Sequence, residues 1–444
     1  MGETNPKRRI SLNAIDMFTV EHMSFGQWRN PADITPDKRR DLTYWTDVAQ
    51  LLERGDFNAY FLADTNGWCD VYEGIAEPCV RNGMQYPMGD PSVPLTAMAA
   101  VTTNLGFAIT ASTSCEKPYV LVKRFSTLYR LTKRRFGWNV VTSGKASGFE
   151  AIGIYSVPHE KRYDIADGYL RGSWVDDALI EDCQDGLYAD FNRKRVIEHE
   201  DERFKLKAPH ILDPSPQRTP FIFQAGSSPA GLHFGATHAK GIFVVGLTPE
   251  TIAPRMKRIR DKVAEVGRVP RSVKVFASMT PILGRTKEEA QSKHRDALQC
   301  ASEEGALMGY QATNVQPQSL MENLSYPGED VLKWTPRTIG KAVALEASGP
   351  VPVGTPEGVA DEIERWVEVA DLAGFNIGHI TVAGTRTDVV DLLVSVLGER
   401  CIFAPKGESG TMRERIHGPG KSRLPIEYVG SRYKYENYSQ QSAL

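Results

Sequence analysis

Polar residues lie in or just after five consecutive strand-like segments of this sequence. They are His22 after the segment 10–16, Asp64 at the end of 58–64, Thr110 in 107–112, Asn139 in 137–143, and Ser227 and Ser228 after 220–226. Imidazole, carboxylate, amide and hydroxyl groups together can bind a polar ligand. Each residue alone could also cap a turn or a helix. Capping alone would not place all these types after successive strands, so we interpret them as one site.

The last of these groups has the composition of a phosphate cradle. Gly226, Ser227 and Ser228 precede a predicted helix, and the first backbone N–H groups and positive dipole end of a helix attract anions. His159 and Tyr163 are four residues apart at the start of another predicted helix, so they share one face. Both side chains can donate hydrogen bonds. Because no G-x-x-x-x-G-K-[ST] loop occurs, the sequence predicts a phosphorylated cofactor held without such a loop.

The cysteine and histidine patterns argue against a metal centre. The six cysteines are scattered without a C-x-x-C pair, and the nine histidines include no H-E-x-x-H sequence. Scattered cysteines in a long chain are typical of free thiols in a reducing compartment. We therefore expect no metal site and a cytoplasmic location.

Charge and hydropathy argue against several classes of protein. The chain has 444 residues, with 53 Lys and Arg against 55 Asp and Glu, and a formal net charge of -2. Nucleic-acid binders usually carry a basic surface, so this balance argues against nucleic-acid binding. No apolar run approaches the ~20 residues that span a bilayer, and the basic N-terminus lacks the apolar core of a signal peptide. We expect no membrane segment.

Strand-like segments alternate with helical patterns along most of the chain. The expected strands are 10–16, 58–64, 107–112, 137–143, 220–226, 241–246, 273–283 and 375–382. The expected helices are 39–54, 91–104, 118–132, 159–174, one ending near 239, 249–267, 287–308, 356–373 and 388–397. Parallel strands need crossover connections, and eight such units fit an α/β fold closed as a (β/α)8 TIM barrel. An open doubly wound sheet is the rival, but it usually carries a G-x-G-x-x-G turn, which this sequence lacks.

Two long polar segments and the C-terminal tail depart from this alternation. We expect residues 1–403 to form a single barrel domain with insertions at about 175–219 and 309–352. Long connections in compact domains are usually lids or binding loops, so both insertions are predicted to close over the barrel mouth. Surface padding or a subunit contact is the alternative. Residues 404–444 lack periodicity and are predicted to form an extended tail, over the surface or across to a neighbouring subunit.

Several motifs carry a resemblance to a known family. They include Ser-Phe-Gly-Gln-Trp-Arg at 24–29, Phe-Leu-Ala-Asp at 61–64, Gly-Trp-Asn-Val-Val-Thr-Ser at 137–143 and Phe-Gln-Ala-Gly-Ser-Ser at 223–228. In order and spacing they resemble the flavin-dependent monooxygenases of the bacterial luciferase-like superfamily. The most similar group contains nitrilotriacetate, dibenzothiophene-sulfone and dimethyl-sulfide monooxygenases. The resemblance covers about residues 9 to 400 and implies a TIM barrel with insertions.

The resemblance also implies a cofactor and roles for the polar residues. FMN would contact Asp64, Thr110, Asn139, His159, Tyr163, Ser227 and Ser228. Asp64 would lie near the isoalloxazine, and Tyr163 and Ser228 would reach the phosphate. Asn139 under the flavin and His22 on the substrate side would be catalytic. We expect a homodimer or a homotetramer.

The implied reaction consumes O2 and reduced FMN, which a separate NAD(P)H-dependent flavin reductase delivers. It oxygenates a small organic substrate at or next to sulfur or nitrogen, with C–S or C–N cleavage. A non-catalytic flavin-binding protein on the same fold is the main alternative, and His22 and Asn139 favour the enzyme over it. A barrel hydrolase or lyase is disfavoured, because the strand ends carry no carboxylate pair or metal cluster.

The sequence departs from the family pattern at places that we expect to lie near the substrate. Arg134 and Arg135 replace the usual Gly-Arg before the fourth strand, and Gly-Lys-Ala-Ser-Gly stands after it, at 144–148. The loop 383–386 lacks the usual Pro-Gly. We therefore infer no particular substrate from any one relative.

Overall fold

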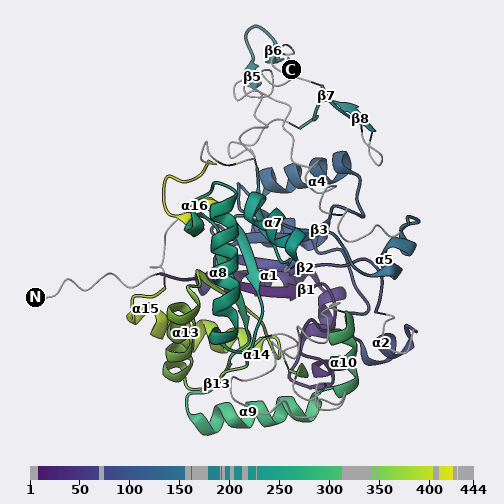
Figure 1. Ribbon diagram of the computed structural model, residues 1–444. Coiled ribbons are helices and arrows are strands. Elements are labelled where there is room, and N and C mark those ends of the chain that lie inside the picture. The colour runs from purple at the N-terminus through teal and green to yellow at the C-terminus, as the bar shows by residue number, and fades with distance from the viewer. Residues whose placement is uncertain are drawn as a thin grey trace, which may run out of the picture.

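The predicted barrel is present and closed. The structure is a computed structural model that describes residues 9–69, 75–155, 162, 179–190, 192, 196–200, 205–212, 219–226, 228–312, 340, 343–345, 349–403, 410–423 and 428. Its eight parallel barrel strands are β1 (Ser11–Met17), β2 (Ala59–Ala63), β3 (Gly106–Ser112), β4 (Phe136–Val141), β9 (Phe221–Gln224), β10 (Gly241–Val244), β11 (Lys274–Met279) and β14 (Gly374–Ile377). They pair in sequence order, and β14 closes the ring against β1 (Figure 1).

Side chains of the strands alternate between the barrel interior and the surrounding helices. Phe61, Phe223, Phe243 and Phe276 form one aromatic layer inside the barrel. The ring centroids of Phe61 and Phe243 are 4.6 Å apart, and those of Phe223 and Phe243 are 5.1 Å apart. Because these rings fill the interior, the barrel is a packed core and a ligand site must lie at one of its ends.

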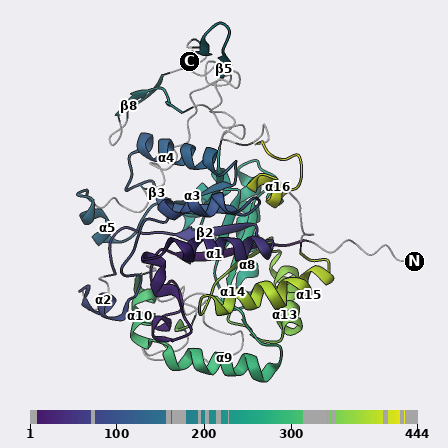
Figure 2. The same cartoon turned by 180° about the vertical axis from the view of Figure 1, so that it is seen from behind.

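Amphipathic helices cover the outside of the barrel. The main ones are α1 (Leu42–Arg54), α3 (Ser92–Ala100), α4 (Pro118–Leu131), α7 (Pro229–His238), α8 (Pro249–Glu265) and α13 (Pro356–Ala370). α1 begins at Asp41, whose carboxylate accepts from the N–H of Thr43, and it buries Trp45 in the core. α8 and α13 begin in the same way, with Thr248 and Thr355 as capping residues. Figure 1 shows α7, α8 and α13 in front of the barrel, and Figure 2 shows α1 and α3 on the opposite side.

Two predicted elements are divided in the structure. The expected strand 273–283 separates into β11 and a short β12 (Ile282–Leu283), which pairs with β13 (Val353–Gly354) outside the barrel. Pro281 stands at this break and cannot donate to a strand ladder. The expected helix 287–308 is two helices, α9 (Lys287–Cys300) and α10 (Glu303–Ala312). Ser302 starts the second helix, because its hydroxyl accepts from the N–H of Gly305 at 3.0 Å.

The last strand and the helix after it also differ from the prediction. β14 ends at Ile377, so the expected strand to residue 382 is shorter than the sequence indicates. The helical segment after it is continuous but is formed by three parts. These are α14 (Gly384–Asp388), the π-helical turn η5 (Val389–Leu393) and α15 (Val394–Glu399).

The first long insertion contains two antiparallel hairpins. β5 (Leu179–Asp182) pairs with β6 (Leu187–Ala189), and β7 (Ile197–Glu200) pairs with β8 (Lys205–Ala208). In both views these hairpins lie beyond α4, away from α2 (Glu77–Asn82) and α5 (Ala146–Ala151), which follow the carboxyl ends of β2 and β4 (Figures 1 and 2). After β8, Nε2 of His210 lies 3.0 Å from Oγ of Ser126 on α4. The described hairpins therefore do not extend over the strand ends, in contrast to the lid prediction for 175–219.

Two further predictions fall largely outside the described residues. They are the helix 159–174, of which the structure describes Arg162, and most of the second insertion, 309–352. The prediction of a lid therefore stays open for the second insertion.

A helix from the C-terminal segment closes the amino-terminal mouth of the barrel. α16 (Met412–His417) begins with a capping box. Met412 and Ile416 pack in the same cluster as the inner aromatic layer. The guanidinium of Arg415 donates to the carbonyl oxygens of Asn104 and Asp56. The tail that the sequence predicts to be extended therefore contains a helix that seals the base of the barrel.

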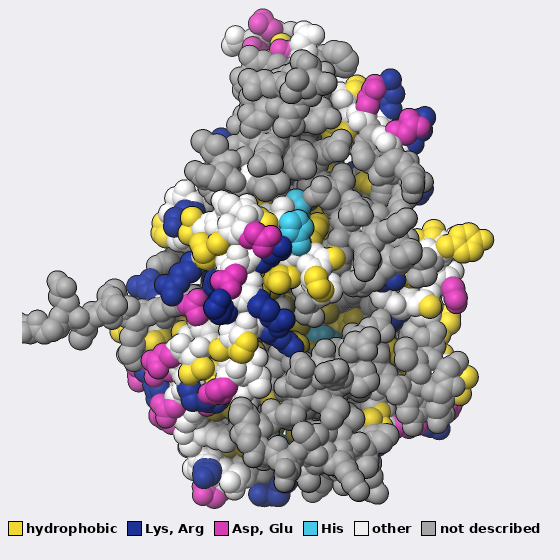
Figure 3. All heavy atoms as spheres, in the orientation of Figure 1, with side chains coloured by type: hydrophobic (Ala, Val, Ile, Leu, Met, Phe, Trp, Pro, Cys, Tyr) yellow, Lys and Arg dark blue, Asp and Glu magenta, His cyan; other side chains and the backbone are white. Residues whose placement is uncertain are grey.

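Charges of both signs are mixed on the outer surface. Figure 3 shows Lys and Arg side chains interspersed with Asp and Glu on one face of the molecule. Ion pairs join Lys257 to Asp261 within α8, and Arg365 on α13 to Glu250 on α8. None of the helices in the described residues has the length and apolar character that a bilayer crossing requires.

Candidate active site

Two of the predicted residues meet inside the barrel, near the carboxyl ends of the strands. Thr110 on β3 and Asn139 on β4 stand opposite each other in register. The amide nitrogen of Asn139 donates to the hydroxyl of Thr110 at 2.9 Å, and both residues are buried. The amide oxygen of Asn139 is also buried, and it has no hydrogen-bond partner among the described residues. An unsatisfied buried acceptor costs about 1–3 kcal/mol, so this oxygen is suited to a donor on a bound molecule.

Ser228 lies at the start of α7, where its hydroxyl caps the helix. Its Oγ accepts from the N–H of Gly231 at 3.1 Å. The hydroxyl proton is still available to an anion, which the positive end of the helix dipole also attracts. Ser227, His159 and Tyr163 lie outside the described residues, so their contacts with a phosphate remain predictions.

Asp64 follows β2 and has a shifted pKa. Burial raises the pKa of its carboxyl to about 7, and the nearby Asp90 contributes in the same direction. Its Oδ1 accepts from the N–H of Thr65 at 2.9 Å. Near neutral pH the side chain is therefore divided between the carboxylate and the carboxylic acid. The acid form can donate a hydrogen bond to a ligand carbonyl group, which a carboxylate cannot do.

His22 lies in the loop after β1 and is buried. Burial lowers the pKa of its imidazole to about 4, although Asp16 opposes the shift. The ring is therefore neutral at pH 7, with one nitrogen that donates and one that accepts. The side-chain nitrogen of Gln85 lies 3.5 Å from the backbone oxygen of His22. At neutral pH this side chain can form hydrogen bonds without carrying a charge.

A buried ionic cluster near the loop after β1 was missed by the sequence analysis. Asp16, close to the end of β1, is 0% exposed. Its carboxylate lies 2.5 Å from Nζ of Lys38 and 2.8 Å from Nη2 of Arg386, and it accepts from the hydroxyl of Tyr60 at 2.7 Å. Nδ1 of His379 lies 3.1 Å from Nη2 of Arg386. Burial would raise the pKa of Asp16, but Lys38 and Arg386 outweigh it and hold this pKa well below its ordinary value.

This cluster joins segments that are distant in the sequence. Lys38 comes from the 3-10 helix η2 (Thr35–Arg39) and Arg386 from α14. They are 22 and 370 residues from Asp16, so no local pattern connects them. One signal was available: Asp16 shares the helix-facing side of β1 with Leu12 and Ala14. A charge on such a buried face needs a partner.

The unusual segment 144–148 forms one side of the mouth. It leads into α5, and Gly148 packs directly on the loop after β2. A Cβ atom on Gly148 would lie 2.5 Å from the carbonyl oxygen of Asn66, so only glycine fits there. The hydroxyl of Ser147 donates to the carbonyl oxygen of Trp68 at 2.7 Å. The loops after β2 and β4 therefore support each other at the carboxyl ends of the strands.

Arg134 and Arg135 lie at the opposite end of the barrel, so the expectation that they are near the substrate is wrong. They precede β4, and Arg134 adopts a left-handed conformation with φ of 71°, in which glycine is favoured. The buried guanidinium of Arg135 donates to the carbonyl oxygens of Ala99, Thr102 and Leu105. Arg135 therefore satisfies backbone carbonyls at the end of α3, which is a structural role.

The fold and the residues at the strand ends define a class of protein. An amide–hydroxyl pair, a titrating carboxyl and a capped helix surround the carboxyl end of a packed parallel barrel, which is where barrel enzymes bind cofactors and substrates. A family model described as luciferase-like monooxygenase matches residues 20–372. The chain belongs to this family and is a flavin-dependent monooxygenase. The resemblance and the enzyme class that the sequence predicts are thereby confirmed.

Similar proteins in this family act on different compounds. The chain is 38% identical to dimethyl-sulfide monooxygenase from Hyphomicrobium sulfonivorans, over 96% of this chain and 94% of that one. It is also 38% identical to long-chain alkane monooxygenase from Geobacillus thermodenitrificans, over 96% of this chain and 98% of that one. A solved structure of a riboflavin lyase with modified FMN and riboflavin matches with a TM-score of 0.86 and 32% identity, covering 96% of this chain and 100% of that one. Membership of the family therefore does not identify the substrate.

Proposed function

We propose that the chain uses reduced FMN and O2 to oxygenate a small organic substrate. The observation that supports FMN most directly is the buried, unpartnered amide oxygen of Asn139, which offers an acceptor to the ring N–H groups of a flavin. The riboflavin lyase structure similar to this chain contains modified FMN. When bound, reduced flavin supplies the electrons that activate O2.

The residues of this chain would bind and orient the cofactor and the substrate. Ser228 and the start of α7 would hold the phosphate, together with Ser227, His159 and Tyr163. Thr110 would fix the orientation of Asn139 beneath the ring through their hydrogen bond. Asp64 in its protonated form would donate to the flavin. His22 would face the substrate as a neutral hydrogen-bonding group.

We propose that a separate NAD(P)H-dependent flavin reductase supplies the reduced FMN. The sequence contains no G-x-G-x-x-G turn for a nicotinamide dinucleotide. The purified chain alone should therefore oxidise NADH very slowly, and addition of a flavin reductase should start the reaction. Efficient NADH oxidation by the chain alone would contradict this division of labour. We also propose that the chain works in the cytoplasm as a homodimer or homotetramer.

We propose that oxygen is inserted at or next to sulfur or nitrogen, so that a C–S or C–N bond breaks. The similarity to dimethyl-sulfide monooxygenase supports this chemistry. An uncharged sulfide also suits the neutral imidazole of His22, which offers no charge to an ionic substrate. A long-chain alkane is the second candidate, because the alkane enzyme is equally similar at 38% identity.

Product analysis with two substrates tests these proposals. The purified chain is supplied with FMN, NADH, a flavin reductase and O2, and with either dimethyl sulfide or a long-chain alkane. Hydroxylation of a methyl group of dimethyl sulfide should release methanethiol and formaldehyde, whereas hydroxylation of the alkane would give an alcohol. Alcohol formation without methanethiol would replace the first candidate by the second. Hydrogen peroxide as the sole product with both compounds would contradict both.

A further inference from the structure

Two buried basic side chains and a partly buried histidine lie near one another at the amino-terminal mouth of the barrel, opposite the candidate active site. We name Lys240, Arg413 and His417 the basal cluster. Lys240 directly precedes β10 and is 5% exposed, and Arg413 on α16 is 2% exposed. His417 is four residues after Arg413, so the two side chains project from one face of α16. The rings of His417 and Phe221 are 5.7 Å apart, which places His417 beside the start of β9.

The basal cluster has buried donors without acceptors. Nη2 of Arg413 donates to the carbonyl oxygen of Thr219 at 2.7 Å, but Nε and Nη1 of this arginine are buried without a partner among the described residues. Nε2 of His417 is also a buried atom that has no hydrogen-bond partner among the described residues. The ammonium group of Lys240 lies 2.9 Å from the ring centroid of Tyr428. No carboxylate of the described residues influences it.

The electrostatic surroundings of the basal cluster are positive. Burial and two neighbouring arginines lower the pKa of Lys240 well below its ordinary value. Burial also lowers the pKa of His417 to about 3, and the charges that add to this shift are those of Lys274, Lys240, Arg413 and Lys421. Burying a cation without a counter-charge is strongly unfavourable. At neutral pH His417 is therefore an uncharged donor, Arg413 keeps its positive charge, and a bound anion would favour the charged form of Lys240.

We propose that the basal cluster binds a small tetrahedral oxyanion of the phosphate class. Such an anion presents several acceptors at once, and arginine and lysine are the side chains that commonly bind phosphate oxygens. It would accept from Nε and Nη1 of Arg413 and from Nε2 of His417, and it would offset the charge of Lys240. The anion would thereby tie α16 to the start of β10. This site is separate from the flavin and does not depend on the proposed reaction.

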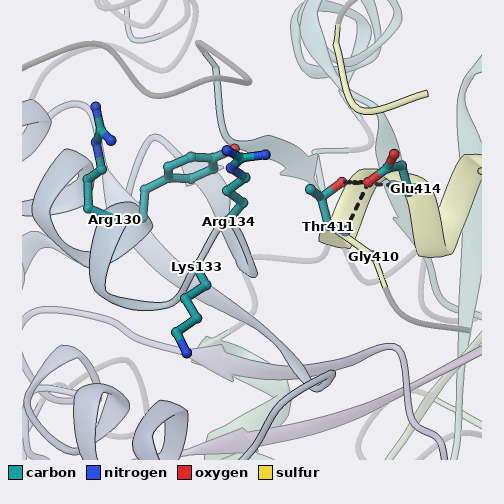
Figure 4. Close-up of a pocket in the computed structure, with 7 residues that line it drawn as sticks. Arg130, Lys133, Arg134, Gly410, Thr411 and Glu414 are labelled. Atoms are coloured by element: carbon teal, nitrogen blue, oxygen red, sulfur yellow. Dashed lines mark hydrogen bonds between the residues drawn. The ribbon is translucent and has the colours of Figure 1, made fainter. Parts of the chain in front are cut away.

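A second basic region lies at the same end of the barrel. A pocket of about 510 Å³ is lined by Tyr129, Arg130, Lys133, Arg134, Gly410, Thr411 and Glu414. Figure 4 shows that the side chains of Arg130 and Lys133 point in opposite directions. The carboxylate of Glu414 accepts from the hydroxyl of Thr411 at 2.8 Å, as part of the capping box. Arg134 is therefore a suitable control, because it is an exposed arginine at the same end.

Titration calorimetry with inorganic phosphate tests the proposal. The full chain is titrated at constant ionic strength, with chloride replacing phosphate in the reference. We expect Arg413→Gln to weaken phosphate binding at least about tenfold, because it removes charged hydrogen bonds. Arg134→Gln should leave the affinity within about twofold, as expected for an exposed charge. Ser228→Ala should affect only phosphate that binds at the start of α7, which distinguishes the basal cluster from that end of the barrel.

Three outcomes would overturn the proposal. They are no measurable phosphate binding, equal affinities of Arg413→Gln and the unchanged chain, and loss of binding in Ser228→Ala alone. If Arg413→Gln fails to fold, Lys240→Met provides the test, because it removes a buried charge without adding a polar group. We expect this variant to have a raised Tm without phosphate and to lose the phosphate-dependent rise in Tm. A rise in Tm with phosphate equal to that of the unchanged chain would contradict the proposal.

Discussion

The two ends of the barrel both bury basic side chains, but they differ in whether a carboxylate is paired with them. At the carboxyl end, Lys38 and Arg386 are buried around the carboxylate of Asp16, at 2.5 and 2.8 Å. At the amino end, Lys240 and Arg413 are equally buried, but no carboxylate of the described residues pairs with them. The buried cations of the first end therefore share a counter-charge that the chain itself supplies. The second end has no counter-charge among the described residues, and an anion from solution would supply one.

This difference determines how the removal of a charged side chain should change the stability at each end. Removal of the acid at the carboxyl end leaves two cations without a partner, whereas removal of a cation at the amino end relieves repulsion. A change of charge should therefore be destabilising at one end and stabilising at the other. Substitutions at the two ends of the barrel distinguish these cases.

Asp16→Asn should be the most damaging substitution. It leaves Lys38 and Arg386 buried without their carboxylate, and the free energy of unfolding should fall by about 3–5 kcal/mol. Urea denaturation at pH 7 measures the change. Asp37→Asn is the matched control, because Asp37 lies next to Lys38 but is exposed, and the midpoint should not move. A loss below about 1 kcal/mol for Asp16→Asn would show that the ionic cluster is not needed for stability.

His22→Gln should remove part of the pH dependence of stability. The unfolded imidazole binds a proton below about pH 6.5, whereas the folded one does so only below about pH 4. The neutral ring therefore contributes full stability above pH 6.5, and this contribution is lost as the pH falls toward 4. Between pH 7 and 4 the unchanged chain should lose about 3 kcal/mol relative to His22→Gln. Urea denaturation across this range gives both curves, and the exposed His233→Gln should reproduce that of the unchanged chain.

Ser228→Ala should separate the phosphate from the rest of the flavin. A hydrogen bond to a charged group contributes roughly 1.5–3 kcal/mol, so the Kd for FMN should rise ~10- to 100-fold. The Kd for riboflavin, which lacks the phosphate, should hardly change in a fluorescence titration. Thr248→Ala removes the equivalent cap of α8 and should affect neither ligand. Equal losses for FMN and riboflavin would place Ser228 away from the phosphate.

Arg134→Gly should give a small gain in stability at the amino end. Arg134 has a φ of 71°, and glycine adopts this conformation without the steric cost of a Cβ atom. We expect the free energy of unfolding to rise by about 0.5 kcal/mol, since the greater freedom of the unfolded glycine offsets part of the relief. Arg134→Ala keeps the Cβ atom and should show no gain. Equal values for the two variants would attribute the effect to the lost charge.

The barrel could be predicted because its signals are local. The predicted strand 137–143 corresponds to β4, Phe136–Val141, and the predicted helix 118–132 corresponds to α4, Pro118–Leu131. In such segments an apolar run or a helical spacing is visible within a few residues. The predicted elements differ from the observed ones where pairing with a segment far away in the sequence determines the structure. The end of the segment 273–283 left the barrel because β12 pairs with β13, some seventy residues away in the sequence.

The candidate site was predictable only in part, for the same reason. Thr110 and Asn139 were accessible because consecutive strands end on one rim, and their hydrogen bond follows from the pairing of β3 with β4. The cluster of Asp16 and Arg386 depends on a contact across 370 residues. Arg135 was misplaced, because similarity to a motif gave its position in the chain but not the end of the barrel on which it lies.

The position of α16 late in the sequence also affects how the barrel folds during synthesis. All eight barrel strands and the helices up to α15 leave the ribosome before Met412 and Ile416 emerge. Until then Phe221 and Phe223, which pack with Met412 in the finished molecule, face water at the base of the barrel. A nascent chain therefore carries an aromatic opening that folding chaperones can recognise, and the packing of α16 on the barrel covers it.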